Sequence, residues 1–224
     1  MPFADRSEAG RQLAKALDGY QGKDAVVLAL PRGGVPVAAE VAAHLEIPLD
    51  LLLVRKIGVP AQPELAMGAV IDGASPIVVR NEGIIRRAWV SADEFERASR
   101  VELAEIERRR LRYLGDRRSV DIEGRIAIVV DDGIATGATM RAAIQGLRRR
   151  HPSKIILAVP VAPPETVGVL RKYADHVICL EEPDFFQAIG FYYRDFRQLS
   201  DQDVIACLDA SRSTMPAHIS AKAK

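Results

Sequence analysis

Short apolar, β-branched runs alternate along the chain with segments in which apolar residues recur at helical spacing. The short runs predict strands buried on both faces, at Ala25–Leu30, Leu49–Val54, Ile126–Val130, Lys154–Pro160 and His176–Leu180. The helical spacing predicts helices at Val35–Leu45, Ala138–Arg149 and Glu165–Tyr173. Strands separated by helices of this length form βαβ units in a parallel sheet. The fold class is therefore α/β, with an open parallel sheet flanked by helices.

Two segments break this alternation. Between Ile57 and Val79, glycine and proline residues surround two short strand-like pieces, which predicts a mobile loop that leads into a hairpin. From Ser91 to Leu114 we expect a long charged helix with a thin apolar stripe, opened by a capping box of Ser91 and Glu94. Such a helix lies across the outside of the domain, where it roofs a site or pairs with a second subunit.

The chain of 224 residues is long enough for one large domain. We place this domain at residues 1–210, with a helical insertion at about 81–118 and a flexible tail at 211–224. At the N-terminus, Asp5 and Glu8 have the spacing of a capping box that opens a helix.

Composition narrows the class of protein. Lys and Arg total 31 against 30 Asp and Glu, and a net charge of +1 argues against a dedicated nucleic-acid coat or a protein attracted to membranes. A basic stretch remains, in which arginines between Arg108 and Arg118 face only Asp116. Two cysteines and no long apolar segment favour a soluble cytoplasmic protein without a disulfide scaffold.

The segment Arg125 to Arg141 carries the clearest chemistry. A buried strand ends in Asp131 and Asp132, passes through a turn at Ala135–Thr139, and enters a helix. Backbone N–H groups at a helix N-terminus bind phosphate well. The two carboxylates would repel a phosphate, so they suit sugar hydroxyls or a Mg²⁺ ion held directly or through water. The segment therefore predicts a site for a phosphorylated sugar.

This pattern resembles the phosphoribosyl-pyrophosphate (PRPP) signature of type I phosphoribosyltransferases. The resemblance implies that Asp131 and Asp132 address the ribose hydroxyls, and that Ala135, Thr136, Gly137, Ala138 and Thr139 hold the 5′-phosphate. It also implies a type I phosphoribosyltransferase fold with a helical insertion and a small aromatic-rich hood region, and a Mg²⁺ cofactor.

Two further segments match this family in the right order. Arg32, Gly33 and Gly34 follow the first strand, where the family keeps its pyrophosphate loop, although this sequence is equally typical of a tight turn. Arg55 and Lys56 end the next predicted strand, where the family has a basic pyrophosphate-binding residue. A solvated strand end is the alternative for these two residues.

Half of the 12 aromatic residues fall between Phe185 and Phe196. This stretch is similar to the segment of hypoxanthine-guanine phosphoribosyltransferases in which a ring stacks on the base. Phe186 is the candidate for stacking on the acceptor, with Phe185 second, since a base stacked on a ring gains about 1–3 kcal/mol. Packing of the rings in the core is the alternative.

The chain departs from the enzymes that act on 6-oxopurines. Ala135 stands where they carry an acid, and Val161 to Pro164 offers no equivalent of their base-side lysine. The chain instead resembles predicted phosphoribosyltransferases with a long helical insertion, whose acceptor is not settled by motif.

The predicted reaction transfers the 5-phosphoribosyl group from PRPP to a nitrogen acceptor, with catalytic roles for Asp131, Asp132, Arg32 and Lys56, in a homo-oligomer. Phosphorolysis or hydrolysis at the same site is also compatible with these residues. The alternative from another class is a non-catalytic PRPP- or nucleotide-sensing module whose arginine patches bind RNA.

Overall fold

The computed structural model describes residues 2–73, 76–117 and 119–213. Its central sheet has five parallel strands in the order β2-β1-β6-β7-β8. These strands are β1 (Ala25–Ala29), β2 (Leu49–Leu51), β6 (Ile126–Val130), β7 (Lys154–Val161) and β8 (His176–Glu181). The α/β class, the parallel sheet and its flanking helices are confirmed.

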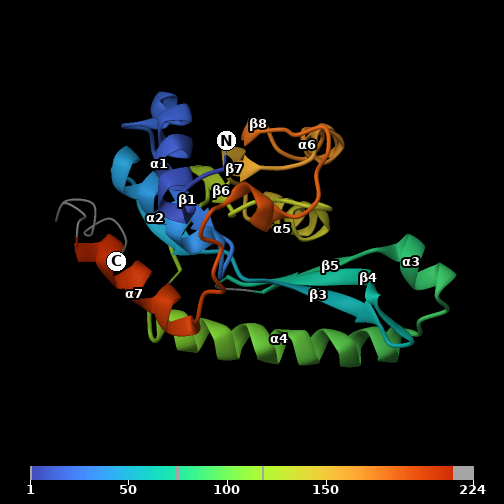
Figure 1. The fold of residues 1–224 in the computed structure, drawn as a ribbon. Helices are drawn as coiled ribbons and strands as arrows, with labels where there is room; N and C mark the ends of the chain where they lie inside the picture. The colour runs from blue at the N-terminus through green and yellow to red at the C-terminus, as the bar shows by residue number, and fades with distance from the viewer. Residues whose placement is uncertain (1, 74–75, 118, 214–224) are drawn as a thin grey trace.

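Helices cover both faces of this sheet (Figure 1). One face packs against α1 (Arg6–Ala16), α2 (Gly34–Leu45) and α7 (Asp201–Ser213), and the other against α5 (Ala138–Arg148) and α6 (Pro164–Leu170). Successive residues of β1 alternate between the two cores: Val27 joins the first and Val26 the second. The fully apolar strands in the sequence are thus explained by burial on both faces.

A second, antiparallel sheet extends away from the first, in the order β3-β4-β5 (Figure 1). Its strands are β3 (Val54–Val59), β4 (Gln62–Ile71) and β5 (Ile77–Arg80). The predicted hairpin is confirmed by the antiparallel pairing of these strands, but the predicted mobile loop is wrong over most of its length, because Gly58 and Gly68 lie inside strands. Gly58 lies at a register shift where Pro63 leaves no room for a Cβ. The predicted strand Leu49–Val54 is likewise too long, since Leu52 and Leu53 connect two different sheets.

The insertion predicted at 81–118 holds two helices, α3 (Glu82–Arg87) and α4 (Ala92–Leu114). The predicted capping box is present, because the side chains of Ser91 and Glu94 bond reciprocally to backbone N–H groups. Helix α4 runs beneath the second sheet (Figure 1), and Phe95 and Ile106 are buried along its inner side.

The arginines of α4 and the turn after it have acidic partners, so the expectation that they face only Asp116 is wrong. Arg108 and Arg109 both pair with Glu105, Arg112 pairs with Asp201, and Arg117 pairs with Asp209. Asp201 and Asp209 belong to α7, which lies far from α4 in the sequence. Arg118 lies outside the described residues.

At the N-terminus, Asp5 caps α1 by accepting from the N–H of Glu8, whereas the Glu8 side chain accepts from the N–H of Ala4. Helix α1 is followed by a short 3-10 helix, η1 (Asp18–Tyr20), and η2 (Ile189–Tyr192) follows β8. Of the predicted tail, residues 211–213 form the end of α7, and residues 214–224 lie outside the described residues. Among the described helices, none has the length and apolarity to cross a membrane.

Candidate functional site

The glycine-containing loop after β1 and the acidic loop after β6 meet because these two strands are neighbours in the sheet. Ala29 is in register with Val130, and the N–H of Leu30 donates to the carbonyl of Val130 at 3.0 Å. The loop that holds Arg32, Gly33 and Gly34 therefore leaves the sheet beside the loop that begins at Asp131. Both loops lie at the carboxyl edge of the parallel sheet, where ligands bind in open α/β folds.

Two glycines allow the loops to touch. A Cβ atom on Gly33 would overlap the carboxylate of Asp132. A Cβ atom on Gly34 would lie 2.7 Å from the carbonyl oxygen of Val130 and 2.8 Å from the Cα atom of Asp131. The close approach of the two loops thus requires glycine at both positions.

The two carboxyl groups differ in their surroundings. Oδ1 of Asp131 accepts from the N–H of Asp132 at 2.8 Å, and burial together with the Asp132 charge raises the pKa of Asp131 well above its usual range. Oδ2 of Asp132 accepts from Nε of Arg6 at 2.7 Å. Burial also raises the pKa of Asp132, while the Arg6 guanidinium opposes that rise. The pair therefore offers one buried, arginine-bound carboxylate and one carboxyl group that resists ionisation.

The turn from Ala135 to Thr139 leads into α5. Gly137 precedes the first residue of the helix with a φ of 70°, in the left-handed region, and no side chain of the described residues caps this end. Thr166 of α6 supports the turn by donating its hydroxyl to the carbonyl of Ala135 at 2.8 Å. Apart from the half-buried Gly137, the turn is exposed, so it presents an uncapped helix N-terminus beside Asp131 and Asp132.

The basic candidates are engaged by other groups. Nη1 of Arg32 donates to the carbonyl of Leu199 at 2.7 Å. Arg55 pairs with Glu102 of α4 at 2.7 Å, and Lys56 pairs with Glu64 at 3.0 Å. Arg55 and Lys56 were predicted at the end of a strand of the main sheet, but they lie inside β3 of the second sheet. The prediction ended the strand at these residues because a glycine- and proline-rich stretch, which is typical of a loop, follows them in the sequence.

A family model described as phosphoribosyl transferase domain matches residues 6–196. The chain belongs to this family. Its parallel sheet, flanked by helices, has the type I phosphoribosyltransferase fold. The match includes both loops described above, together with α4 and the aromatic segment that follows β8.

Named proteins and solved structures resemble the chain over most of its length. It is 49% identical over 207 residues, 92% of its length, to "Putative phosphoribosyl transferase Rv0571c" of Mycobacterium tuberculosis strain H37Rv, and equally to a second such protein of strain CDC 1551. The chain spans about half the length of these curated relatives, 46%. The crystal structure of TT1426 from Thermus thermophilus is 42% identical, with a TM-score of 0.83, and covers 93% of this chain and 98% of its own.

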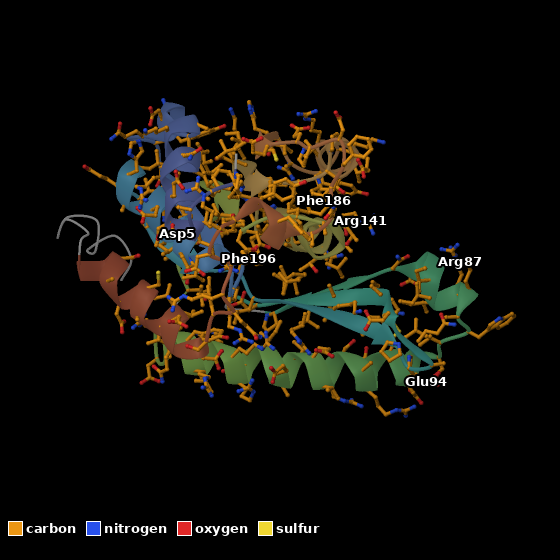
Figure 2. All side chains as sticks on the ribbon, viewed as in Figure 1. Asp5, Arg87, Glu94, Arg141, Phe186 and Phe196 are labelled. Carbon is orange, nitrogen blue, oxygen red and sulfur yellow. The ribbon has the colours of Figure 1, made fainter. Side chains whose placement is uncertain are left out.

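The aromatic segment of this phosphoribosyl transferase domain divides into two groups. Phe186 stacks on Tyr192 with ring centroids 5.6 Å apart, whereas Phe185 is 92% exposed. Tyr193 and Phe196 stack on each other at 5.0 Å, beside Asp132 and Arg6. Figure 2 shows Phe186 and Phe196 at separate places along the segment after β8. The rings are thus partly packed and partly exposed.

Two residues that contact the candidate site were missed by the sequence analysis. Arg6 reaches Asp132 from the first residue of α1, and the hydroxyl of Tyr193 donates to the backbone carbonyl of Asp132 at 2.6 Å. Burial raises the pKa of Tyr193, so its hydroxyl stays protonated and remains a donor. Neither residue belongs to a local motif. The signal that points to Tyr193 is its place in the aromatic cluster, and no local signal points to Arg6.

Proposed function

We propose that this phosphoribosyl transferase domain transfers the 5-phosphoribosyl group of PRPP to a nitrogen atom of a small acceptor and releases pyrophosphate. In this reaction the bond from the anomeric carbon to the pyrophosphate oxygen breaks, a bond from that carbon to the acceptor nitrogen forms, and the nitrogen loses a proton. The observation that carries the proposal is the contact between the Gly33 loop and the Asp132 carboxylate, which joins two distant motifs into one surface.

Each part of PRPP has a matching group along this surface. The uncapped N-terminus of α5, at Ala135–Thr139, suits the 5′-phosphate because its N–H groups and helix dipole favour a dianion. Asp131 and Asp132 suit the ribose hydroxyls as acceptors. Arg32 and the backbone at Gly33 and Gly34 suit the pyrophosphate.

Mg²⁺ fits this site as a companion of the pyrophosphate. Among the described residues, no group of three acidic, histidine or cysteine side chains forms a metal cage. Mg²⁺ commonly binds through one or two carboxylates together with substrate phosphates, and Asp132, with Asp131 once it is ionised, would supply such carboxylates directly or through water. When bound, the ion would neutralise charge on the departing pyrophosphate.

The residues of the chain hold and orient the reactants. Departure of pyrophosphate leaves positive charge on the anomeric carbon, so no side-chain nucleophile is needed. Holding the 5′-phosphate, the ribose and the pyrophosphate on one edge of the sheet supplies proximity and electrostatic stabilisation. The carbonyl of Leu199 engages Nη1 of Arg32, and a guanidinium has five N–H donors, so the side chain can bind pyrophosphate while it keeps this bond. Arg55 and Lys56 pair with Glu102 and Glu64, so either carboxylate would compete with pyrophosphate for the basic side chain.

We propose Phe186 as the ring on which the acceptor stacks, with Phe185 second. Phe186 is half-buried against Tyr192, which keeps one ring face packed.

We also propose a homo-oligomer in which α4 pairs with α4 of a second copy. Support comes from two apolar side chains on the outer side of this helix, Val101 and Leu111, which are 66% and 52% exposed. Sedimentation of the wild type against a Val101→Glu, Leu111→Glu variant tests this pairing.

A pyrophosphate-release screen tests the proposed reaction. PRPP and Mg²⁺ are combined with a panel of purines, pyrimidines and other nitrogen acceptors, using the wild type and an Asp131→Asn, Asp132→Asn variant. Release by the wild type with one acceptor class, lost in the variant, supports the proposal. PRPP binding no tighter in the wild type than in the variant contradicts it. PRPP binding without release from any acceptor favours the sensing module instead.

A further inference from the structure

Arg6 is a buried cation at the edge of the proposed ribose site. It is 9% exposed, although it is the first residue of a helix whose other charged residues face solvent or are half-buried. Nε donates to Oδ2 of Asp132 at 2.7 Å, and Nη1 donates to the carbonyl of Arg197 at 3.0 Å. Its guanidinium carbon lies 3.9 Å from the centre of the Phe196 ring. Two segments distant in sequence, at Asp132 and at Phe196 and Arg197, therefore fix the orientation of this guanidinium.

Arg6 in turn fixes the carboxylate of Asp132. Oδ2 of Asp132 accepts from Arg6, and the same carboxylate lies against Gly33. Its backbone carbonyl accepts from the Tyr193 hydroxyl at 2.6 Å. A carboxylate whose rotamer and backbone are both fixed loses little freedom when it accepts a hydrogen bond from a ligand.

Stability alone does not explain this ion pair. A buried arginine–carboxylate pair often contributes no more to stability than apolar side chains of similar volume, because desolvation offsets the attraction. A role in holding one carboxylate in a defined place accounts for the pair, since a hydroxyl ligand is recognised by the position of the acceptor oxygen.

We propose that Arg6 is a positioning residue that sets the preference of this site for ribose over deoxyribose. Arg6 holds the Asp132 carboxylate where it accepts hydrogen bonds from a sugar hydroxyl, and it does not itself touch the sugar. This inference rests on the proposed function, in which Asp131 and Asp132 bind the ribose hydroxyls. The inference adds Arg6 as the residue on which discrimination between ribose and deoxyribose by these two carboxyl groups depends.

The test measures dissociation constants by calorimetry for ribose 5-phosphate, its 2-deoxy and 3-deoxy forms, and inorganic phosphate. Arg6→Gln removes the charge, Arg6→Lys keeps the charge but lacks the guanidinium fork, and Arg11→Gln is the control. Arg11 lies on the same helix in an exposed pair with Glu40. Circular dichroism confirms that each variant is folded.

The proposal predicts that the Arg6 variants lose the preference for ribose but keep their affinity for inorganic phosphate. In Arg6→Gln, the preference for ribose 5-phosphate over at least one deoxy form falls about tenfold, and affinity for inorganic phosphate stays within about twofold. In Arg6→Lys the preference falls by roughly threefold, because a single ammonium does not hold both Asp132 and the Arg197 carbonyl. Arg11→Gln keeps the wild-type preference.

Other outcomes overturn the proposal. Equal weakening of all four ligands in Arg6→Gln assigns Arg6 a merely structural role. If Arg6→Gln does not fold, a wild-type preference in Arg6→Lys overturns the positioning role. If the wild type discriminates and Asp132→Asn abolishes the discrimination while both Arg6 variants keep it, this inference fails and the proposed function stands. If the wild type does not bind ribose 5-phosphate, the proposed function fails and this inference with it.

Discussion

Gly33 and Asp132 are packed so closely that position 33 has no room for a side chain. The backbone of Gly33 has a φ of −60°, which any residue adopts, so space and not conformation restricts this position. Gly33→Ala should therefore push the Arg32 loop away from Asp132, lower the free energy of unfolding by about 1–3 kcal/mol, and weaken PRPP binding by about tenfold. Chemical denaturation and calorimetry measure the two effects.

Gly168→Ala is the matched control for this substitution. A Cβ atom on Gly168 would meet no atom within 4 Å, and the residue lies inside α6. We expect this variant to bind PRPP like the wild type and to gain about 0.5–1 kcal/mol in stability. PRPP binding by Gly33→Ala equal to that of the control would contradict the close packing of the two loops.

Tyr193→Phe removes the hydroxyl that donates to the Asp132 carbonyl. The carbonyl is then left without this buried partner, and we expect a loss of about 1–2 kcal/mol in the free energy of unfolding, measured in urea. Tyr192→Phe is the matched control, because its hydroxyl makes only a 3.4 Å contact with the carbonyl of Phe185 near the surface. Equal stability of the two variants would show that the buried hydrogen bond contributes nothing.

Phe186→Ala should raise the KM for the acceptor more than it changes PRPP affinity. Loss of a stacking ring costs about 1–3 kcal/mol per base, roughly fivefold to 150-fold in KM. Steady-state kinetics and PRPP calorimetry measure the two quantities. Phe185→Ala is the comparison, and a larger effect at position 185 would transfer the stacking role to that exposed ring. Equal losses of acceptor use and PRPP binding would remove the role from Phe186.

Asp72 should make the stability of the protein depend on pH. It lies between β4 and β5, where Oδ1 accepts from the N–H of Leu53 at 3.0 Å. Burial raises the pKa of Asp72 from 3.8 to about 7, and the charge of Asp50 adds to this rise, whereas Arg150 and Arg110 oppose it. The folded state therefore binds this proton more tightly than the unfolded state does.

This tighter binding of the proton in the folded state sets the direction in which the free energy of unfolding changes with pH. Between about pH 4 and pH 7 the contribution of Asp72 should reduce the free energy of unfolding as pH rises, by about 4 kcal/mol at most, and level off above the folded pKa. Asp72→Asn should flatten this part of a urea-denaturation series, while Asn at the exposed Asp184 should leave the profile unchanged. Parallel profiles for the wild type and Asp72→Asn would contradict the prediction.

The main sheet and its helices were predictable because their residues carry the pattern themselves. Val26 to Ala29 and Ile128 to Val130 are apolar at every position, as burial on both faces requires. The second sheet was predicted only as a hairpin that follows a mobile loop. Glycine is typical of loops, but Gly58 and Gly68 lie in strands where a neighbouring chain segment comes too close for a Cβ atom. Helix α7 was missed as well, since its short sequence is mostly polar and small.

The site was predictable to the extent that its residues are adjacent in sequence. Asp131, Asp132 and the turn to Thr139 form one segment, and a parallel sheet brings the end of β1 beside them. Arg6 and Tyr193 reach Asp132 only through tertiary packing, 126 and 61 residues away. Asp201 and Asp209, the partners of Arg112 and Arg117, were missed for the same reason, because they come from a separate helix, whereas Glu105, the partner of Arg108 and Arg109, lies within α4 itself.

The carbonyls of Arg197 and Leu199, which hold Arg6 and Arg32, have a consequence for biosynthesis. Arg32 leaves the ribosome 167 residues before Leu199, and Arg6 precedes Arg197 by 191 residues. At about 5–20 residues per second, both guanidinium groups wait roughly 8 to 40 s for their acceptors. A nascent chain that already contains β1 and β6 therefore lacks these two contacts, and the order of translation makes the geometry of the candidate site one of the last features to form.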